Sequence, residues 1–400
     1  MKILHVIAGV NPAGGGPIEG ILRQAEVWAR HGHQREIVSL DNPDDPWVKD
    51  CPVKCYALGI RSTIYRRMQG IIPWLRYGYS PKLVPWLSSH AANYDAIIVN
   101  GLWNYTAFAS LRALADAGVP YFVFTHGQLD PWFREFYPVK NIAKQILWLF
   151  SEGRLLRRAR AVLFTSEAER RKARNAFWPY QMREKLIGYG TADVVDEPAR
   201  QMEALYACMP QLADRRFLLF LSRIHPKKGC DILIRAFARY ARNYPDLDLV
   251  IAGPDQTGWR LELEHLADEA GVSGRIHWPG MLTGDAKWGA YRAAEAFALP
   301  SHSENFGIVV AEALACGCPV LITTQVDIWR EVLAGGGGLV SRDNEKEFAR
   351  IVGEFLERSL EERTDMAIAA RNTFVLRFDI EFVAMSMLAR LQDLVADDAV

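Results

Sequence analysis

Short apolar runs alternate with amphipathic helical patterns along the whole chain. Each run is too short for a typical helix, and polar or glycine-rich residues follow it. This alternation predicts parallel sheets covered by helices, so we predict an α/β fold with two doubly wound domains. The predicted strands are 2–8, 36–40, 96–99, 121–125 and 161–165 in the first half, and 217–221, 247–251, 275–278, 296–299 and 320–323 in the second.

A polar, irregular segment between residues 191 and 214 separates the two series of strands. A chain of 400 residues is long for a single hydrophobic core. We therefore predict a first domain over residues 1–195 and a second over 210–377. The connection contains a short helical pattern at 203–208.

The segment LPSHSENFGIVVAEALACGCPVLI, residues 299–322, follows the pattern strand, polar loop, helix. The helix is expected to begin near Phe306. The backbone amides of Asn305, Phe306 and Gly307 would then lie at a helix N-terminus, which attracts anions. Gly307 has no side chain to keep a phosphate away. These features predict an anion site at this strand end.

Two acids flank the predicted anion site. A carboxylate beside a phosphate would repel it, so Glu304 is better suited to accept hydrogen bonds from hydroxyls of a group attached to the phosphate. Glu312, on the helix, could hold a ribose in the same way. A sugar joined to a nucleotide through a diphosphate meets all these demands. A structural explanation stays open for each acid alone, because acids near a helix start also complement the helix dipole.

Three further strand ends carry candidate binding residues. Arg223 and Lys228 in the loop SRIHPKKG would suit a diphosphate whose charge grows as a bond breaks, although each alone is more often a surface cation. Gly15 and Gly16 belong to a triple glycine that allows close approach of a phosphate or sugar, or is simply a flexible loop. His126 follows the strand FVFT and could contact a substrate hydroxyl, or satisfy hydrogen bonds in the core.

Charge is distributed unevenly although the net charge is zero. Residues 1–200 contain 26 Lys and Arg against 18 Asp and Glu, and residues 201–400 contain 21 against 29. The first half is therefore expected to face something anionic: a membrane surface, a phosphorylated lipid or a nucleic acid. Residues 61–87 hold five basic and no acidic residues among aromatic ones, which favours a membrane interface about as strongly as internal packing. For the basic stretch 140–160, which includes Trp148 and Phe150, a packed helix with a solvated basic face is favoured.

Several classes of protein lose support. The chain has no Ser-His-Asp arrangement, Walker loop or HExxH motif, and its six cysteines lack metal-ligand spacing, so they are expected to be reduced thiols. No apolar run approaches the length of a membrane span, and the first residues lead into a glycine-rich loop. We therefore expect a cytoplasmic protein, peripheral on the inner face of the membrane.

Together, SRIHPKKG, ENFGIVVAE with EALACGCPVL, the triple glycine and FTHG resemble a retaining nucleotide-sugar glycosyltransferase of the glycogen-synthase-like superfamily, in the large GT-B group called family four. The resemblance implies two Rossmann-like domains that face each other across a cleft. It also implies that the second domain binds the donor, that the first binds the acceptor, and that no metal or other cofactor is needed. It also implies that the final helix, 378–400, packs back on the first domain. Arg223 and Lys228 would bind the diphosphate, Glu304 the hydroxyls of the donor sugar, Glu312 the ribose, and His126 a hydroxyl of the transferred sugar.

We therefore expect a hexosyltransferase-type enzyme that moves a sugar from a nucleoside diphosphate, UDP or GDP, to a lipid-linked or polysaccharide acceptor in cell-surface glycan synthesis. The expected partners are the donor, a lipid-linked glycan and an anionic membrane surface, and nucleic acid is not among them. The alternatives are a nucleotide-sugar epimerase of the same fold and a catalytically inactive membrane-associated scaffold.

Overall fold

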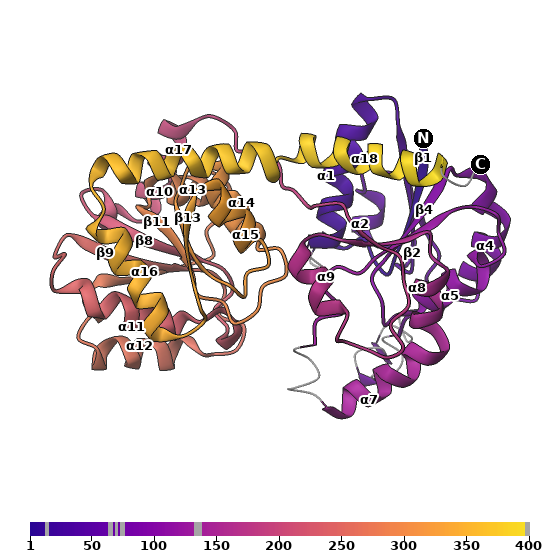
Figure 1. Ribbon diagram of the computed structural model, residues 1–400, viewed down its shortest axis with the longest axis horizontal. Helices are drawn as coiled ribbons and strands as arrows, with labels where there is room; N and C mark the ends of the chain where they lie inside the picture. Colours follow the sequence, from indigo (N-terminus) through magenta and orange to yellow (C-terminus); the bar gives the residue numbers. More distant parts are fainter. Residues whose placement is uncertain (13–15, 63–66, 69–70, 73–76, 132–137, 397–400) are drawn as a thin grey trace. The chain divides into compact units, whose positions relative to one another are not determined.

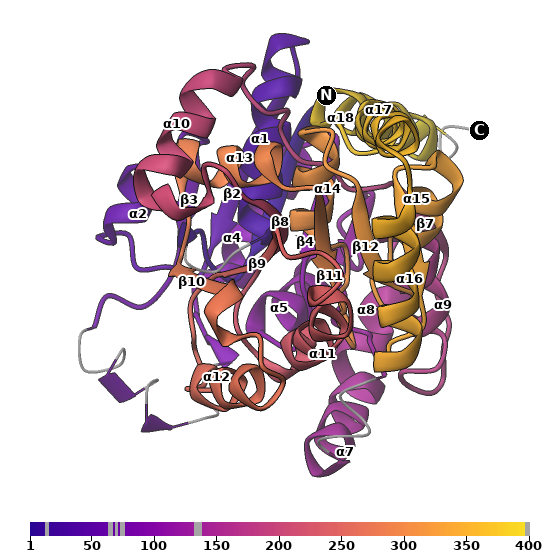
Figure 2. The same cartoon turned by 90° about the vertical axis from the view of Figure 1, so that its left-hand side faces the viewer.

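The computed structural model describes residues 1–12, 16–62, 67–68, 71–72, 77–131 and 138–396. The chain divides into two compact units (Figures 1 and 2). Unit 1 comprises Met1–Tyr189 and Ile380–Val400, and unit 2 comprises Gly190–Asp379. Each contains one parallel sheet with helices on its faces, which confirms the predicted α/β fold class. The sequence predicted the domain boundary between residues 195 and 210, whereas the two units meet at Tyr189 and Gly190.

The sheet of unit 1 has seven parallel strands in the order β3-β2-β1-β4-β5-β6-β7. Five of them were predicted, with ends that differ by one or two residues. The two edge strands, β3 and β7, were not predicted because each has three residues and no apolar run. The strands are β1 (Lys2–Ile7), β2 (Gln34–Ser39), β3 (Cys55–Ala57), β4 (Ala96–Asn100), β5 (Tyr121–Phe124), β6 (Ala161–Phe164) and β7 (Glu184–Leu186).

The helices of unit 1 include α18, from the end of the chain, which packs on α1. Trp28 of α1 donates from its indole nitrogen to the carbonyl oxygen of Ala384, 2.8 Å away, and Arg30 pairs with Glu381. The helices are α1 (Gly16–Arg30), α2 (Pro46–Lys49), α4 (Leu83–His90), α5 (Tyr105–Leu114), α7 (Pro138–Leu147), α8 (Gly153–Arg158), α9 (Glu167–Ala173) and α18 (Ile380–Ala396), with a 3-10 turn at Ala91–Asn93 and a π-helical turn at Trp148–Glu152.

Unit 2 has six parallel strands in the order β10-β9-β8-β11-β12-β13. β13 was not predicted, because its four residues follow a run of glycines that hides the apolar pattern. The strands are β8 (Arg216–Leu221), β9 (Leu247–Ala252), β10 (Ile276–Gly280), β11 (Ala296–Leu299), β12 (Val320–Thr323) and β13 (Gly338–Ser341).

Half of the segment expected to be irregular, 191–214, is helical. α10 packs closely on α13, and the closest approach is at Gly289, where an added Cβ would lie 2.0 Å from the carbonyl oxygen of Gln201. The helices of unit 2 are α10 (Pro198–Cys208), α11 (Cys230–Ala241), α12 (Arg260–Glu269), α13 (Gly284–Ala293), α14 (Ile308–Ala315), α15 (Trp329–Gly335), α16 (Glu345–Glu357) and α17 (Leu360–Arg377), with 3-10 turns at Pro210–Leu212, Pro226–Lys228 and Ser273–Arg275.

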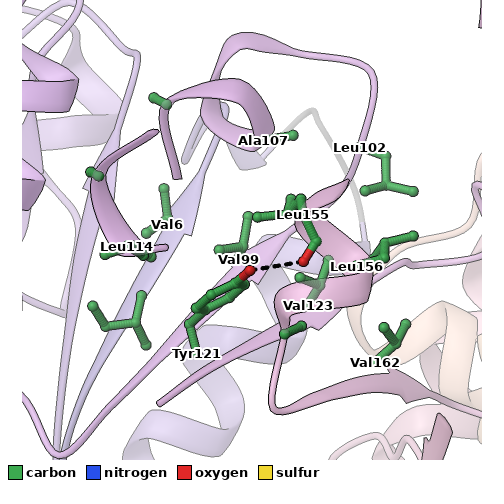
Figure 3. Packing of buried hydrophobic residues seen from close by; sticks show 14 of the residues in the cluster. Val6, Val99, Leu102, Ala107, Leu114, Tyr121, Val123, Leu155, Leu156 and Val162 are labelled. Atoms are coloured by element: carbon green, nitrogen blue, oxygen red, sulfur yellow. Dashed lines mark hydrogen bonds between the residues drawn. The ribbon is translucent and has the colours of Figure 1, made fainter. Parts of the chain in front are cut away.

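The central strands of both sheets are buried on both faces, as parallel sheets require. Figure 3 shows part of the core of unit 1, where the hydroxyl of Tyr121 donates to the carbonyl oxygen of Leu155, 2.8 Å away, and so satisfies a buried polar group between β5 and α8. Side chains from four neighbouring strands meet there: Val6, Val99, Val123 and Val162. Both sheets therefore hold the loops at their carboxyl ends on a rigid base.

Candidate active site

The loop between β11 and α14 is held in place from both sides. Glu304 forms a short parallel bridge with Val326: its amide donates to Gln325, and its carbonyl accepts from Asp327. The ring of Phe306 is buried and packs edge-on against Phe378, with 5.6 Å between ring centres. Phe306 is therefore an anchor, and only its backbone is suited to a ligand.

The helix begins at Ile308, two residues later than predicted, because Gly307 takes a left-handed conformation with φ of 75°. A Cβ on Gly307 would lie 3.1 Å from Val326 and 3.3 Å from Glu304. Glycine therefore allows both the turn and the close packing of the loop. Asn305 is half-buried in the same turn.

Lys228 and Glu304, which lie on different loops, form an ion pair. Lys228 ends a 3-10 turn after β8, and only 6% of its surface is exposed. Burial, and after it the positive charges of Arg223 and Lys227, lowers the pKa of the Lys228 amine to about 7. The adjacent carboxylate of Glu304 opposes this and favours the charged amine.

The turn that carries Lys228 packs on the end of β11. Gly229 has φ of 69°, and a Cβ there would lie 2.2 Å from the carbonyl oxygen of Pro300. His302 donates from its backbone amide to the carbonyl oxygen of Lys227, 2.9 Å away. These contacts join the two loops that hold the lysine and the acid.

Arg223 lies on the same loop as Lys228 but is exposed. Its guanidinium donates to the side-chain oxygen of Gln256, 3.3 Å away. A neutral amide holds arginine less strongly than a carboxylate does, so Arg223 can turn toward an anion at low energetic cost.

Glu312 is buried on α14, and both of its oxygens are engaged from α13. One accepts from the amine of Lys287 at 2.8 Å, and the other accepts from the hydroxyl of Tyr291 at 3.2 Å. Sequence reasoning did not identify these two partners. Their spacing of four residues, which puts them on one helix face, was the signal available.

His126 follows β5 with φ of 48°, in the left-handed region. Its Nε2 lies 3.1 Å from Oδ1 of Asn100, at the end of β4. Burial lowers the pKa of His126 to about 3, so the ring is neutral at physiological pH. It lines a cavity of about 250 Å³ together with Gly9, Asn100, Asn104 and Gln128 among others.

Of the two candidate glycines, Gly16 is the first residue of α1, and Gly15 lies outside the described residues. Pro17 and Ile18 of α1, which directly follow Gly16, line the cavity. In the described ranges no group of three or more His, Cys, Asp or Glu is arranged to hold a metal ion. All six cysteines are free thiols. The absence of a metal requirement stays a prediction.

Residues 210–373 match the family model described as "Glycosyl transferases group 1", and residues 15–190 match "Glycosyl transferase 4-like domain". The two matches follow one another, the first model lying in unit 2 and the second almost wholly in unit 1. The chain belongs to the group 1 glycosyltransferases.

Curated relatives of this glycosyltransferase chain are similar over part of its length. D-inositol 3-phosphate glycosyltransferase of Mycolicibacterium smegmatis is 36% identical over 149 residues, which cover 36% of this chain and 33% of that protein. The enzyme of the same name from Actinosynnema mirum is 41% identical over 115 residues, 27% of this chain and 28% of that protein. The chain thus matches about a third of the length of these relatives.

Solved structures are similar over the whole glycosyltransferase chain. Anabaena HepE in complex with UDP and glucose has a TM-score of 0.70 and 20% identity, covering 98% of this chain and 100% of that one. Sucrose-phosphate synthase from Thermosynechococcus elongatus has a TM-score of 0.71 and 19% identity, covering 99% of each chain. These similarities support the GT-B fold, with two Rossmann-like domains.

The candidate residues of this glycosyltransferase form two groups, one in each unit. In unit 2 the structure brings Lys228 into contact with Glu304 and puts Arg223 on the same loop as Lys228. Glu312 lies farther along α14, with partners of its own. In unit 1, His126 lines a cavity at the carboxyl end of the sheet.

Proposed function

We propose that this chain is a retaining glycosyltransferase that moves a hexose from a nucleoside diphosphate to a lipid-linked or polysaccharide acceptor. The observation on which this rests is the junction of two loops in unit 2, where Lys228 meets Glu304 beside the start of α14. A buried cation, a nearby exposed arginine and a glycine-lined helix start suit a diphosphate. HepE, which has a similar fold, was crystallised in complex with UDP and glucose, and this favours a UDP-sugar.

In the proposed reaction the bond between C1 of the sugar and the diphosphate oxygen breaks, and the acceptor hydroxyl oxygen forms the new bond to C1 from the same face. The proton of the acceptor hydroxyl passes to the departing diphosphate. Arg223 and Lys228 stabilise the negative charge that grows on this leaving group. Lys228 exchanges Glu304 for the diphosphate, and Glu304 then accepts hydrogen bonds from sugar hydroxyls. Glu312 binds the ribose.

The experiment is a panel of UDP- and GDP-sugars, ranked first by thermal shift of the full chain and then assayed for transfer. We expect one nucleotide class to stabilise the protein, a product with the anomeric configuration of the donor, and transfer that EDTA does not reduce. Conversion of the donor into its epimer would support the epimerase alternative. Binding without transfer or hydrolysis would support the scaffold, and inverted product would contradict the retaining mechanism.

We further propose that unit 1 binds an anionic membrane surface through α7 and the turn after it. Four side chains, which we call the apolar stripe, lie on this segment and are 54–79% exposed: Val139, Ile142, Ile146 and Phe150. The segment 140–160 was expected to present a solvated basic face, which is wrong for α7, because its exposed positions are largely apolar. Trp148 is buried, and its indole donates to Pro179.

Basic residues lie next to the apolar stripe. Arg154, Arg157 and Arg158 are exposed and line, with Phe150, a hollow of about 770 Å³. An apolar stripe bordered by arginines matches the boundary between lipid tails and anionic headgroups. Figures 1 and 2 show α7 extending from the edge of unit 1.

Segment 61–87 contributes less to this surface than its composition indicated. Trp86 stacks on His90, with 4.4 Å between ring centres, and Tyr77 packs against Tyr105. Trp86 and Tyr77 are therefore part of the internal packing. Ile71 is 79% exposed. Arg66 and Arg76 lie outside the described residues. In the described ranges no helix is long and apolar enough to span a bilayer.

A further inference from the structure

A chain of polar side chains crosses three neighbouring strands next to the His126 cavity. Asn100, only 3% exposed, ends β4 between β1 and β5. Its Oδ1 lies 3.1 Å from Nε2 of His126, and its Nδ2 lies 3.2 Å from Nδ1 of His5, which is 2% exposed. One amide therefore connects a histidine that lines the cavity to a histidine in the core.

The surroundings of Asn100 decide which way its amide faces. Nδ2 lies 3.0 Å from the carbonyl oxygen of Ile98 and 3.4 Å from that of Val6. Carbonyl oxygens only accept hydrogen bonds, so the amide nitrogen must face them and Oδ1 must face His126. Since Oδ1 cannot donate, the hydrogen bond exists only if Nε2 of His126 carries the proton.

A neutral imidazole has one N–H, and Nε2 of His126 uses it on Asn100. We propose that Asn100 is a positioning residue that fixes His126 as the Nε2–H tautomer and leaves Nδ1 as the acceptor for a ligand hydroxyl in the cavity. That the hydroxyl belongs to the transferred sugar rests on the proposed function. The ring then recognises a group that donates a hydrogen bond. A fluorine or an ether oxygen at the same place cannot donate one to Nδ1.

The position of His126 is held by a different residue. Glu169 accepts from the hydroxyl of Thr125 at 2.9 Å and from the amide of Gly127 at 2.7 Å, on either side of the histidine. Its other oxygen accepts from the amide and hydroxyl of Thr165, which directly follows the next strand, β6. Glu169 and Asn100 therefore have separate roles. Glu169 holds the left-handed backbone around His126, and Asn100 determines which ring nitrogen of His126 carries the proton.

The first test needs no ligand. Full-length protein labelled with ¹⁵N-histidine is measured at pH 7 by long-range ¹H–¹⁵N NMR, which shows the nitrogen that carries the proton, and His126 is assigned by the signal lost in His126→Gln. We expect the pure Nε2–H tautomer in the wild type. A pure Nδ1–H tautomer, or a mixture of the two, would overturn the proposal.

Variants separate the tautomer from the fold. Asn100→Leu removes the acceptor and should give a mixture of tautomers. Asn100→Asp supplies a carboxylate that stabilises the charged ring, so Nδ1 should become protonated. Glu169→Gln is the matched control and should keep the wild-type tautomer. An unchanged Nε2–H tautomer in Asn100→Leu would count against the role of Asn100, and circular dichroism confirms folding.

Kinetics with UDP-glucose and its monodeoxy and monofluoro analogues test the ligand side. At one sugar position, deoxygenation and fluorination should both lower kcat/KM by about tenfold, the equivalent of one hydrogen bond, because fluorine cannot donate to Nδ1. In Asn100→Asp this discrimination should disappear. Fluorination tolerated at every position would overturn the acceptor role. The expected NMR result in a protein that transfers no sugar would support the positioning role and reject the proposed function alone.

Discussion

The ion pair between Lys228 and Glu304 gives each residue a role that it would not have alone. A buried lysine is costly unless an anion lies beside it, and Glu304 is such an anion. A diphosphate can take over this role, which releases the acid for sugar hydroxyls. The pair therefore links phosphate binding to sugar binding through one exchange of partners.

Substitutions at these residues should separate phosphate binding from sugar binding. Arg223→Ala and Lys228→Ala each remove a cation that faces growing charge, so kcat should fall about 10²-fold and affinity for free nucleoside diphosphate should fall too. Glu304→Gln should weaken the intact donor and slow transfer, while affinity for the free diphosphate should not fall at pH 6. Calorimetry with both ligands on each variant measures this.

The pH adds a further check on Glu304→Gln. Burial lowers the pKa of Lys228 to about 7, and removing the carboxylate removes the neighbour that favours its charged form. As pH rises from 6 to 8, the variant should therefore lose diphosphate affinity earlier than the wild type does. If Glu304→Gln loses the free diphosphate at pH 6 as severely as Arg223→Ala, the acid organises the phosphate loop and the assigned sugar role is wrong.

At the scale of elements, the donor side depends on how closely two loops pack at the end of the β8–β11 pair. The turn after β8 approaches the end of β11 so closely that only glycine fits at Gly229. The turn before α14 is likewise held by Gly307 against Val326. The candidate residues are thus positioned by strand ends and tight turns, which bring distant parts of the sequence together.

Gly229→Ala should lower the free energy of unfolding by more than its left-handed backbone angle alone explains. Gly271, at the end of α12, has the same φ of 69°, but an added Cβ would meet nothing within 4 Å. Gly271→Ala should lower the free energy of unfolding by about 1–2 kcal/mol, the cost of a left-handed residue. Gly229→Ala adds the clash with Pro300, so urea denaturation should show a larger loss, and diphosphate affinity should fall only in this variant. Equal losses in the two variants would contradict the packing argument.

At the scale of the whole molecule, the structure shows where some of the excess basic residues of the first half lie. The excess of basic residues in the first half includes the arginines beside the apolar stripe of α7. An exposed apolar stripe with cations at its edge is costly in water and favourable at a lipid surface. A lipid-linked acceptor would be found at that surface.

Vesicle sedimentation tests this membrane face. Wild type should bind vesicles that contain phosphatidylglycerol more tightly than vesicles of phosphatidylcholine alone. Ile142→Glu combined with Ile146→Glu should reduce binding about tenfold or more, since it removes apolar contact and adds repulsion. Leu261→Glu, at a residue 68% exposed in unit 2, is the matched control and should change nothing. Equal binding to both lipids, or equal effects of the two changes, would reject the membrane face.

The sequence by itself determined the alternation of strands and helices, and with it the fold class. The strands at 296–299 and 320–323 were predicted with their observed bounds, because each is a continuous apolar run beside a turn signal. The family was also readable, since its motifs are local strings of residues. Edge strands such as β7 were not predicted, because three residues without an apolar run leave no pattern in the sequence.

Only the tertiary structure decided how the candidate residues act on one another. Lys228 and Glu304 are 76 residues apart, and Glu312 meets Lys287 across 25, so no local pattern could pair them. The structure also turned the apolar side of α7 outward and buried Trp148, which composition alone did not distinguish. Local propensity depends on neighbours in the chain, whereas contact, burial and charge pairing depend on neighbours in space, which the fold alone brings together.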